Sequence, residues 1–153
     1  MTNGISNACT LVLALAFPVA ALADASGSLT IAPNTNFSFD NGTSGSSGGD
    51  IRWTGPEITF VGNAAGVNFG QQGAAGYNNL TQYSLTSAYS EGAYNTTPII
   101  SLATGEVFAV FTNGGNYAKV LIISVSATAL QFQYVTYGRR LPAGRPCLRS
   151  RRF

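Results

Sequence analysis

Residues 106–137 decide the fold, and they read EVFAVFTNGGNYAKVLIISVSATALQFQYVTY. Two apolar runs, 106–112 and 117–126, are rich in Val, Ile and Phe, and the NGGN stretch between them is a strong turn signal. A third run, 130–137, alternates apolar and polar residues. Three such runs joined by short turns predict an antiparallel meander of three strands.

The faces of these runs predict where each strand lies. The first two runs are apolar on both faces, so we expect them at the centre of a sheet that is covered on both sides. The third run has one partly polar face, which places it nearer an edge or solvent. Lys119 interrupts the second run, and we expect it opposite Val110, with its amine reaching the sheet edge or a carboxylate.

A second hairpin is predicted upstream, around Gly55-Pro56. Gly at the first turn position suits a two-residue type II′ turn. In that register Trp53 faces Ile58, and one face of the hairpin is wholly apolar. Trp53 therefore lies either in a core or on a sheet surface that binds a ligand.

The whole pattern predicts a mainly β fold. Residues 28–32 and 36–40 add two candidate strands, and 81–88 is the only plausible helical turn. We expect a small antiparallel sandwich or partly closed barrel of about six to eight strands, with a C-terminal three-strand meander and at most one short helix. Residues 24–138 form a single domain in this interpretation.

The first residues are typical of an export signal. Residues 11–22, LVLALAFPVAAL, form an apolar run that is too short for a transmembrane helix, which needs about 20 residues. Ala21-Leu22-Ala23 matches a small-residue cleavage site, so we expect a signal peptide over 1–23 and a secreted or periplasmic protein without a transmembrane segment after cleavage. The alternative is a buried N-terminal helix. Cleavage removes one of the two cysteines and leaves Cys147, which excludes an internal disulfide.

The last residues have a different composition. Six of the eight Lys and Arg residues lie in 139–153, whereas all six acids lie before it. Residues 24–138 thus carry a net charge of 2 − 6 = −4, and the segment after them carries +6. We expect a basic disordered tail. It is a solvated tail without a partner, a tail that contacts nucleic acid, anionic lipid or an acidic partner, or the product of out-of-frame translation. We expect no specific nucleic-acid partner.

The sequence offers no credible catalytic constellation. The chain has no His, which excludes Ser-His and Cys-His pairs and His-ligated zinc. Ser47 matches G-x-S-x-G literally, but within a Gly/Ser run rather than a strand-turn-helix elbow. No spacing singles out a pair of carboxylates. We therefore predict a protein that is not an enzyme and that needs no cofactor and no metal.

The loop between Asp40 and Asp50 is the one stretch that resembles a calcium ligand set. It offers oxygen ligands, but only two carboxylates and no D-x-D-x-D-G spacing. Asx turns at two strand ends explain it better than calcium does.

Aromatic residues supply the positive hypothesis about function. Tyr and Trp on a sheet face give a large contact area with a polar tip, which suits both sugar stacking and protein recognition. We single out Trp53, Tyr117, Tyr134 and Tyr137 as candidate ligand contacts, with burial in the core as the alternative for the first three. The leading hypothesis is an exported, non-catalytic binding or surface-interaction module for a glycan or a cell-surface protein. The alternatives are a carbohydrate-binding or carbohydrate-active domain, and a structural subunit that assembles through edge strands.

Residues 36–138 resemble a family of secreted bacterial proteins of unknown function. The resemblance lies in a VFAVxTNxGNYAKV segment followed by an apolar strand that ends in VTY. It also covers the FSFDNGTSGSSGGDIRW stretch, where an Asp-x-Gly-Thr turn leads to an Asp-headed strand with a Trp. The resemblance implies export and a β-rich fold, and it implies no activity. The matching positions are 37–53, 79–81, 94–99, 107–113, 115–120 and 135–137.

Overall fold

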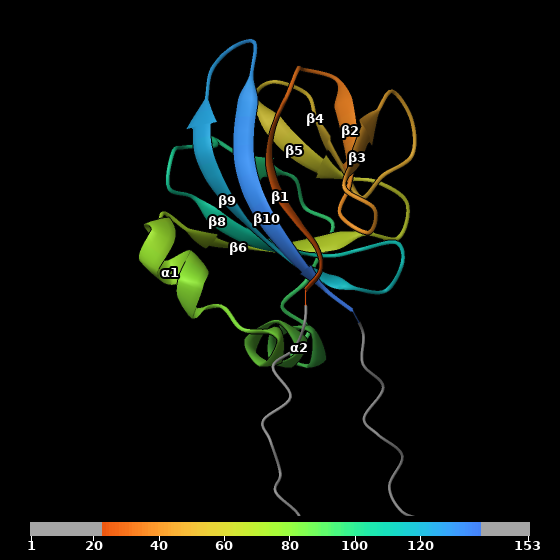
Figure 1. Ribbon diagram of the computed structural model, residues 1–153, viewed down its shortest axis with the longest axis vertical. Coiled ribbons are helices and arrows are strands. Elements are labelled where there is room, and N and C mark those ends of the chain that lie inside the picture. Colours follow the sequence, from red (N-terminus) through yellow and green to blue (C-terminus); the bar gives the residue numbers. More distant parts are fainter. Residues whose placement is uncertain (1–22, 139–153) are drawn as a thin grey trace, which may run out of the picture.

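The protein is a two-layered antiparallel β-sandwich (Figure 1). The computed structural model describes residues 23–138, so the expected leader, apart from Ala23, and the basic tail lie outside the described residues. Ten strands and two helices follow the order β1 (Ala23–Ile31), β2 (Thr35–Ser38), β3 (Thr43–Gly45), β4 (Ile51–Trp53), β5 (Glu57–Phe60), β6 (Ala65–Gly70), α1 (Gly73–Asn79), α2 (Gln82–Ser90), β7 (Ile99–Ile100), β8 (Val107–Phe111), β9 (Tyr117–Val125) and β10 (Leu130–Tyr137).

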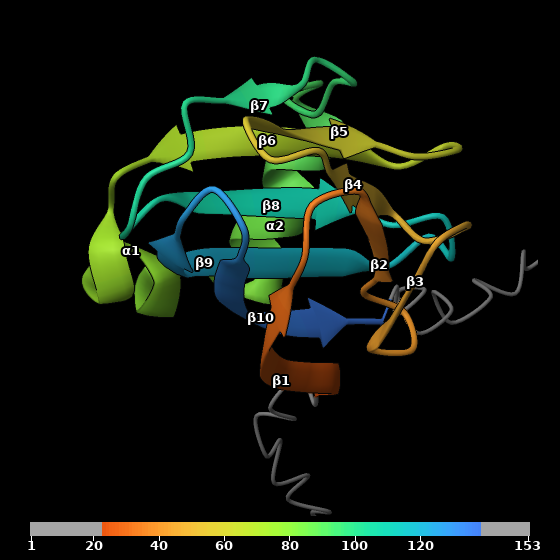
Figure 2. The same ribbon diagram turned by 90° about the horizontal axis from the view of Figure 1, so that it is seen from above.

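The strands form two sheets of five that do not close into a barrel. One sheet has the order β1-β10-β9-β8-β6 and the other has the order β3-β2-β4-β5-β7. Seen from above, the two sheets lie on either side of a common core (Figure 2). The predicted sandwich is thus confirmed. The additional strands are short or Gly-rich, such as β6 and β7, which is why the sequence pattern did not indicate them.

The meander β8-β9-β10 is confirmed, with β8 and β9 inside their sheet. The third strand is not itself an edge strand, because β1 pairs with β10 from Ala23 opposite Tyr137 to Ile31 opposite Leu130, but it lies next to that edge strand and nearer the edge than β9 does. The alternation of β10 is nevertheless real. Its even-numbered side chains are buried in the sandwich, and its odd-numbered ones are half-buried on the outer face.

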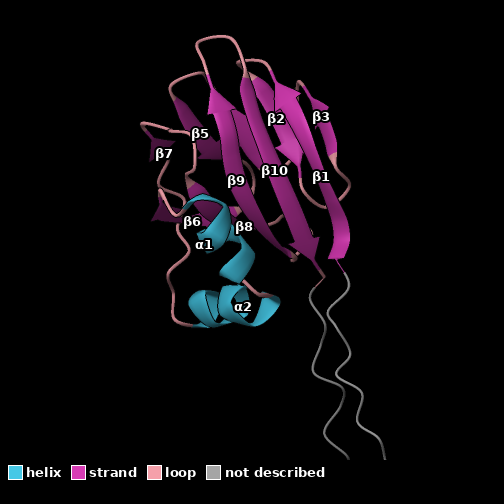
Figure 3. Ribbon diagram, turned by 60° about the vertical axis from the view of Figure 1, so that its left-hand side comes forward, coloured by secondary structure: helices cyan, strands magenta, loops and turns pink. Residues whose placement is uncertain are grey.

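Both helices cover the outer face of the first sheet, against β8 and β9 (Figure 3). Thr81 caps α2 through a capping box with Ser84, which is the physical reason for the predicted helical turn. α1 was not predicted, so the expectation of at most one helix is wrong. Its sequence, GAAGYNN, contains two glycines and carries little helical propensity of its own.

The core between the sheets is built around aromatic rings. Phe37 and Phe39 from the β2 region pack edge-to-face with each other and with Tyr134 of β10. Trp53 and Ile58 face each other across the β4–β5 hairpin, as the sequence predicted, and both are fully buried. Aromatic burial therefore holds the two layers together.

Candidate functional site

Two of the predicted ligand-contact aromatics are core residues. Trp53 has no exposed surface, and its Nε1 donates a hydrogen bond to the Gly55 carbonyl at 2.8 Å. Tyr134 is 6% exposed within the aromatic core. Both side chains point between the sheets, because the apolar face of each strand is the face that packs. Their burial supports the core alternative over contact with a ligand.

Tyr117 of β9 and Tyr137 of β10 lie on the outer face of the first sheet, beneath α2. Tyr117 is 3% exposed and packs against the rings of Tyr89 and Phe111, so it too is a packing residue. Tyr137 is half-buried beside the same cluster, and burial raises the pKa of its phenol. The more exposed tyrosines are instead on α2: Tyr83 at 81% and Tyr89 at 39%.

Asp50 is fully buried and accepts hydrogen bonds from the backbone. Its two carboxylate oxygens accept hydrogen bonds from the backbone N–H groups of Phe39 and Asn113, both at 2.7 Å. Burial raises the pKa of the Asp50 carboxyl, while these two N–H donors act to lower it. The carboxylate ties the end of β2 to the turn between β8 and β9.

Asp40 also binds the turn between β8 and β9, through other residues than Asp50 does. Its carboxylate accepts from the Thr112 hydroxyl at 2.6 Å, the Gly114 N–H at 2.9 Å and the Asn116 side-chain amide at 2.9 Å. Donor hydrogens therefore surround the two carboxylates of the loop that resembled a calcium site. Within residues 23–138 no group of three or more His, Cys, Asp or Glu side chains could hold a metal ion.

Lys119 binds helix α1. Its ammonium donates to the carbonyls of Tyr77 at 3.0 Å and Leu80 at 2.8 Å, where the helix ends, and lies 4.5 Å above the Tyr77 ring. A cation at a helix C-terminus is favourable because the last carbonyls lack intrahelical partners. The strand partner of Lys119 is Ala109, not Val110 as the sequence suggested, and its amine reaches neither the sheet edge nor a carboxylate.

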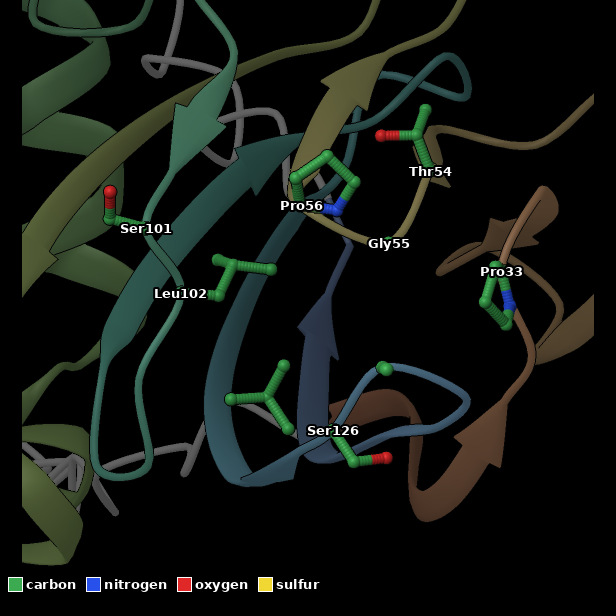
Figure 4. Close-up of a pocket in the computed structure, with 9 residues that line it drawn as sticks. Pro33, Thr54, Gly55, Pro56, Ser101, Leu102 and Ser126 are labelled. Atoms are coloured by element: carbon green, nitrogen blue, oxygen red, sulfur yellow. The ribbon is translucent and has the colours of Figure 1, made fainter.

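One hollow that could serve as a binding site is a groove at one end of the sandwich (Figure 4). It has a volume of about 550 Å³ and is open to solvent. Four connections meet there: the β1–β2 turn, the β4–β5 hairpin, the segment after β7 and the β9–β10 hairpin. The side chains that Figure 4 labels around the opening include Pro33, Pro56, Leu102 and Ser126.

The lining of this end groove is uncharged. Pro33, Pro56, Leu102 and Val125 give it an apolar wall, and small hydroxyl residues complete it. Of these, Ser126 is engaged in its own hairpin, where its Oγ binds the backbone of Ala129. The groove thus favours a ligand that is apolar and uncharged along its contact surface.

Ser101, on the groove wall, has an unusual backbone. Its φ is +58°, and such values in non-glycine residues cost free energy and cluster at functional sites. The residue before it, Ile100, is 65% exposed. This segment therefore combines a strained backbone with exposed apolar surface. Sequence reasoning missed it, since neither a positive φ at Ser nor an exposed Ile has a signature in a single sequence.

Comparison with protein-family models finds no match, and comparison with curated proteins and with solved structures finds none either. The resemblance to secreted bacterial proteins therefore stays a prediction. None of the helices within residues 23–138 has the length and apolar character that a membrane-spanning helix requires.

Proposed function

We propose that the protein is an exported, non-catalytic binding module whose end groove accepts an uncharged, apolar segment of a partner polypeptide. The observation that carries the proposal is the groove itself, an open hollow of about 550 Å³ built from four connections and lined without charge. Loops held by a rigid sheet scaffold are where binding surfaces are most often built. Export rests on the leader-like segment at 11–23.

The chemistry of the lining supports binding to a polypeptide. Apolar walls formed by proline, leucine and valine desolvate an apolar side chain well, and a few hydroxyls at the rim suit backbone hydrogen bonds. A charged ligand would be left without a counter-ion there. The lining offers hydroxyl groups but no titratable side chain for proton transfer, which supports a role in binding rather than in turnover.

A groove-filling substitution tests the proposal. Ala127 lines the groove on the exposed β9–β10 hairpin, and Thr128 is its exposed neighbour outside the lining. An array of uncharged peptides should yield binders whose affinity falls at least tenfold in Ala127→Trp and stays within about twofold in Thr128→Trp. Leu102→Ala should weaken the same binders, because it removes part of the apolar wall.

Two results would overturn this function. One is that no uncharged peptide binds, or that binders respond equally to Ala127→Trp and Thr128→Trp. The other is turnover in a broad hydrolase screen that disappears when Ser101 or Ser47 is replaced by Ala, because a binding module has no reaction to lose. Circular dichroism of both Trp variants checks that the sandwich is intact.

A further inference from the structure

Two Asn-Gly pairs lie within the described residues, Asn41-Gly42 between β2 and β3 and Asn113-Gly114 between β8 and β9. Asparagine is a thermolabile residue. It loses its side-chain ammonia when the backbone nitrogen of the next residue attacks the amide carbon, Cγ, and closes a cyclic imide. Glycine in that next position has no Cβ to hinder the attack and lets the backbone rotate freely. The two pairs share this advantage, so their hydrogen bonds decide which asparagine reacts.

Asn113 is held by other loops of the chain. Its side-chain amide bonds to backbone groups of the β3–β4 and β5–β6 connections, namely the Asn63 N–H at 2.7 Å and the carbonyls of Gly49 at 2.7 Å and Val61 at 3.0 Å. The attacking nitrogen is also occupied, because the Gly114 N–H donates to the Asp40 carboxylate at 2.9 Å. Ring closure at Asn113 would have to break all of these bonds, so the fold protects this pair.

Asn41 is exposed, and its side chain bonds within its own turn. Its Oδ1 accepts from the Thr43 backbone N–H at 3.2 Å and from the Thr43 hydroxyl at 2.6 Å, which is the geometry of an Asx turn. Since a backbone N–H only donates, this bond identifies which amide atom is the oxygen. Nδ2 makes no hydrogen bond to a residue within 23–138, so nothing there holds it as a leaving group.

The two donors on Oδ1 lie where charge develops during ring closure. Attack of the Gly42 nitrogen on Cγ turns Oδ1 into an oxyanion, and hydrogen bonds that are already in place strengthen as that charge grows. The Gly42 N–H is held by one bond, to the Ser38 carbonyl at 2.9 Å, within an exposed turn. Exposed turns open locally at a free energy far below that of global unfolding, which lets the nitrogen turn toward Cγ.

We propose that Asn41 is a spontaneous modification site, at which the folded protein converts this asparagine into aspartate or isoaspartate with assistance from Thr43. The Gly42 nitrogen gives its proton to water or hydroxide and bonds to Cγ, and the Cγ–Nδ2 bond breaks as the leaving ammonia takes a proton from water. Water then opens the imide at either carbonyl, and the nitrogen regains its proton. The net reaction consumes one water and releases one ammonia, without oxidation or reduction.

The modification changes the charge and the shape of the β2–β3 turn. The net charge of 24–138 goes from −4 to −5. An aspartate product stays on the two Thr43 donors, which bind a carboxylate more strongly than a neutral amide. An isoaspartate product adds a carbon atom to the main chain just before β3, which pairs with β2 from Thr43 opposite Ser38. The reaction runs in one direction, so older molecules carry a more acidic turn. It does not involve the end groove.

Trypsin separates the two pairs for analysis, because the basic residues of 24–138 are Arg52 and Lys119 alone. Asn41 lies in the fragment that ends at Arg52, and Asn113 lies in fragment 53–119. The full chain is aged in mildly alkaline buffer below its Tm and digested, and mass spectrometry locates each exchange of a side-chain NH2 for OH. Asn41 should convert at least about tenfold faster than Asn113, because ring closure at Asn113 breaks three more hydrogen bonds.

Thr43→Val tests the assistance. It keeps a β-branched residue at an exposed position of β3 and removes the hydroxyl donor, so the conversion of Asn41 should slow roughly three- to tenfold, as expected for one hydrogen bond. Ser44→Ala removes a neighbouring exposed hydroxyl that does not bond to Asn41, and this matched control should leave the rate unchanged. Circular dichroism checks that both variants fold.

Urea supplies the control for sequence. In unfolded chains the turn hydrogen bonds are lost, so the two Asn-Gly pairs should convert at similar rates and Thr43→Val should have no effect. The proposal is overturned if Asn113 converts as fast as Asn41 in the folded protein, if Thr43→Val leaves the folded rate unchanged or raises it, or if the difference between the pairs persists in urea. If Thr43→Val does not fold, the comparison of the two pairs in the wild type still decides the question.

Discussion

Removal of the Asp50 carboxylate should destabilise the sandwich more than most single substitutions. In Asp50→Ala the backbone N–H groups of Phe39 and Asn113, each now 2.7 Å from an acceptor oxygen, would both lose that acceptor. A buried donor left unpaired costs about 1–3 kcal/mol. The Phe39 donor is buried and the Asn113 donor is only partly buried, so water relieves part of the second loss, and together they give a loss of about 2–4 kcal/mol from a stability that is typically 5–15 kcal/mol.

Urea unfolding followed by circular dichroism measures this loss. At about 4 °C per kcal/mol for a domain of this size, the Tm should fall by about 8–16 °C. Asp50→Asn keeps the shape and one acceptor oxygen, so it should lose about half as much free energy. The exposed Glu91→Ala should change stability by less than about 0.5 kcal/mol and serves as the control. A loss below about 1 kcal/mol in Asp50→Ala, with an unchanged m value, would refute the argument that these bonds hold the β8–β9 turn.

Three further predictions concern single side chains. Tyr94→Phe should raise stability by about 1 kcal/mol in thermal unfolding, because it removes a buried hydroxyl that has no partner in the described chain; destabilisation would indicate a bound water. Gly115→Val should cost at least about 1 kcal/mol, because Gly115 has a φ of +81°, whereas an unchanged Tm would contradict the turn geometry. Burial lowers the pKa of Lys119 below 10.5, so the unfolded chain binds the Lys119 proton more tightly than the folded protein does. The stability of the wild type relative to Lys119→Met should therefore rise as the pH approaches 10.5. A constant or shrinking difference between pH 8 and pH 10.5 would contradict that direction.

The register of the two hairpins shows how far a single sequence can be interpreted. The Gly55-Pro56 turn allows only one pairing of the flanking apolar residues, and that pairing is correct. The NGGN turn allowed two pairings of its flanking strands, and the expected pairing was shifted by one residue from the observed one. The Gly115 N–H bonds to Thr112 and the Thr112 N–H bonds to Asn116, which makes a three-residue loop with Gly115 in the left-handed region. A two-residue loop would have placed Lys119 opposite Val110.

Other features depend on contacts that are distant in sequence. α1 is held in part by Lys119, about 40 positions away, so its own residues could not predict it. The alternation around Trp53 and Tyr134 predicted that each lies on the apolar face of its strand. Whether that face packs against the other sheet or faces a ligand depends on how the two sheets pack together. The end groove arises where connections from different hairpins meet, and no local motif marks such a place.

The pairing of β1 with β10 determines how the module can be attached to something else. Ala23 and Tyr137 are strand partners at one end of this pair, and Ile31 and Leu130 are partners at the other, next to the connections that form the end groove. Eight residues of extended chain separate these ends by about 25 Å. A fusion partner, a bead or a surface joined next to Ala23 or next to Tyr137 would therefore leave the groove facing the medium. The domain can be displayed from either side of its sequence without blocking the opening that we propose it uses.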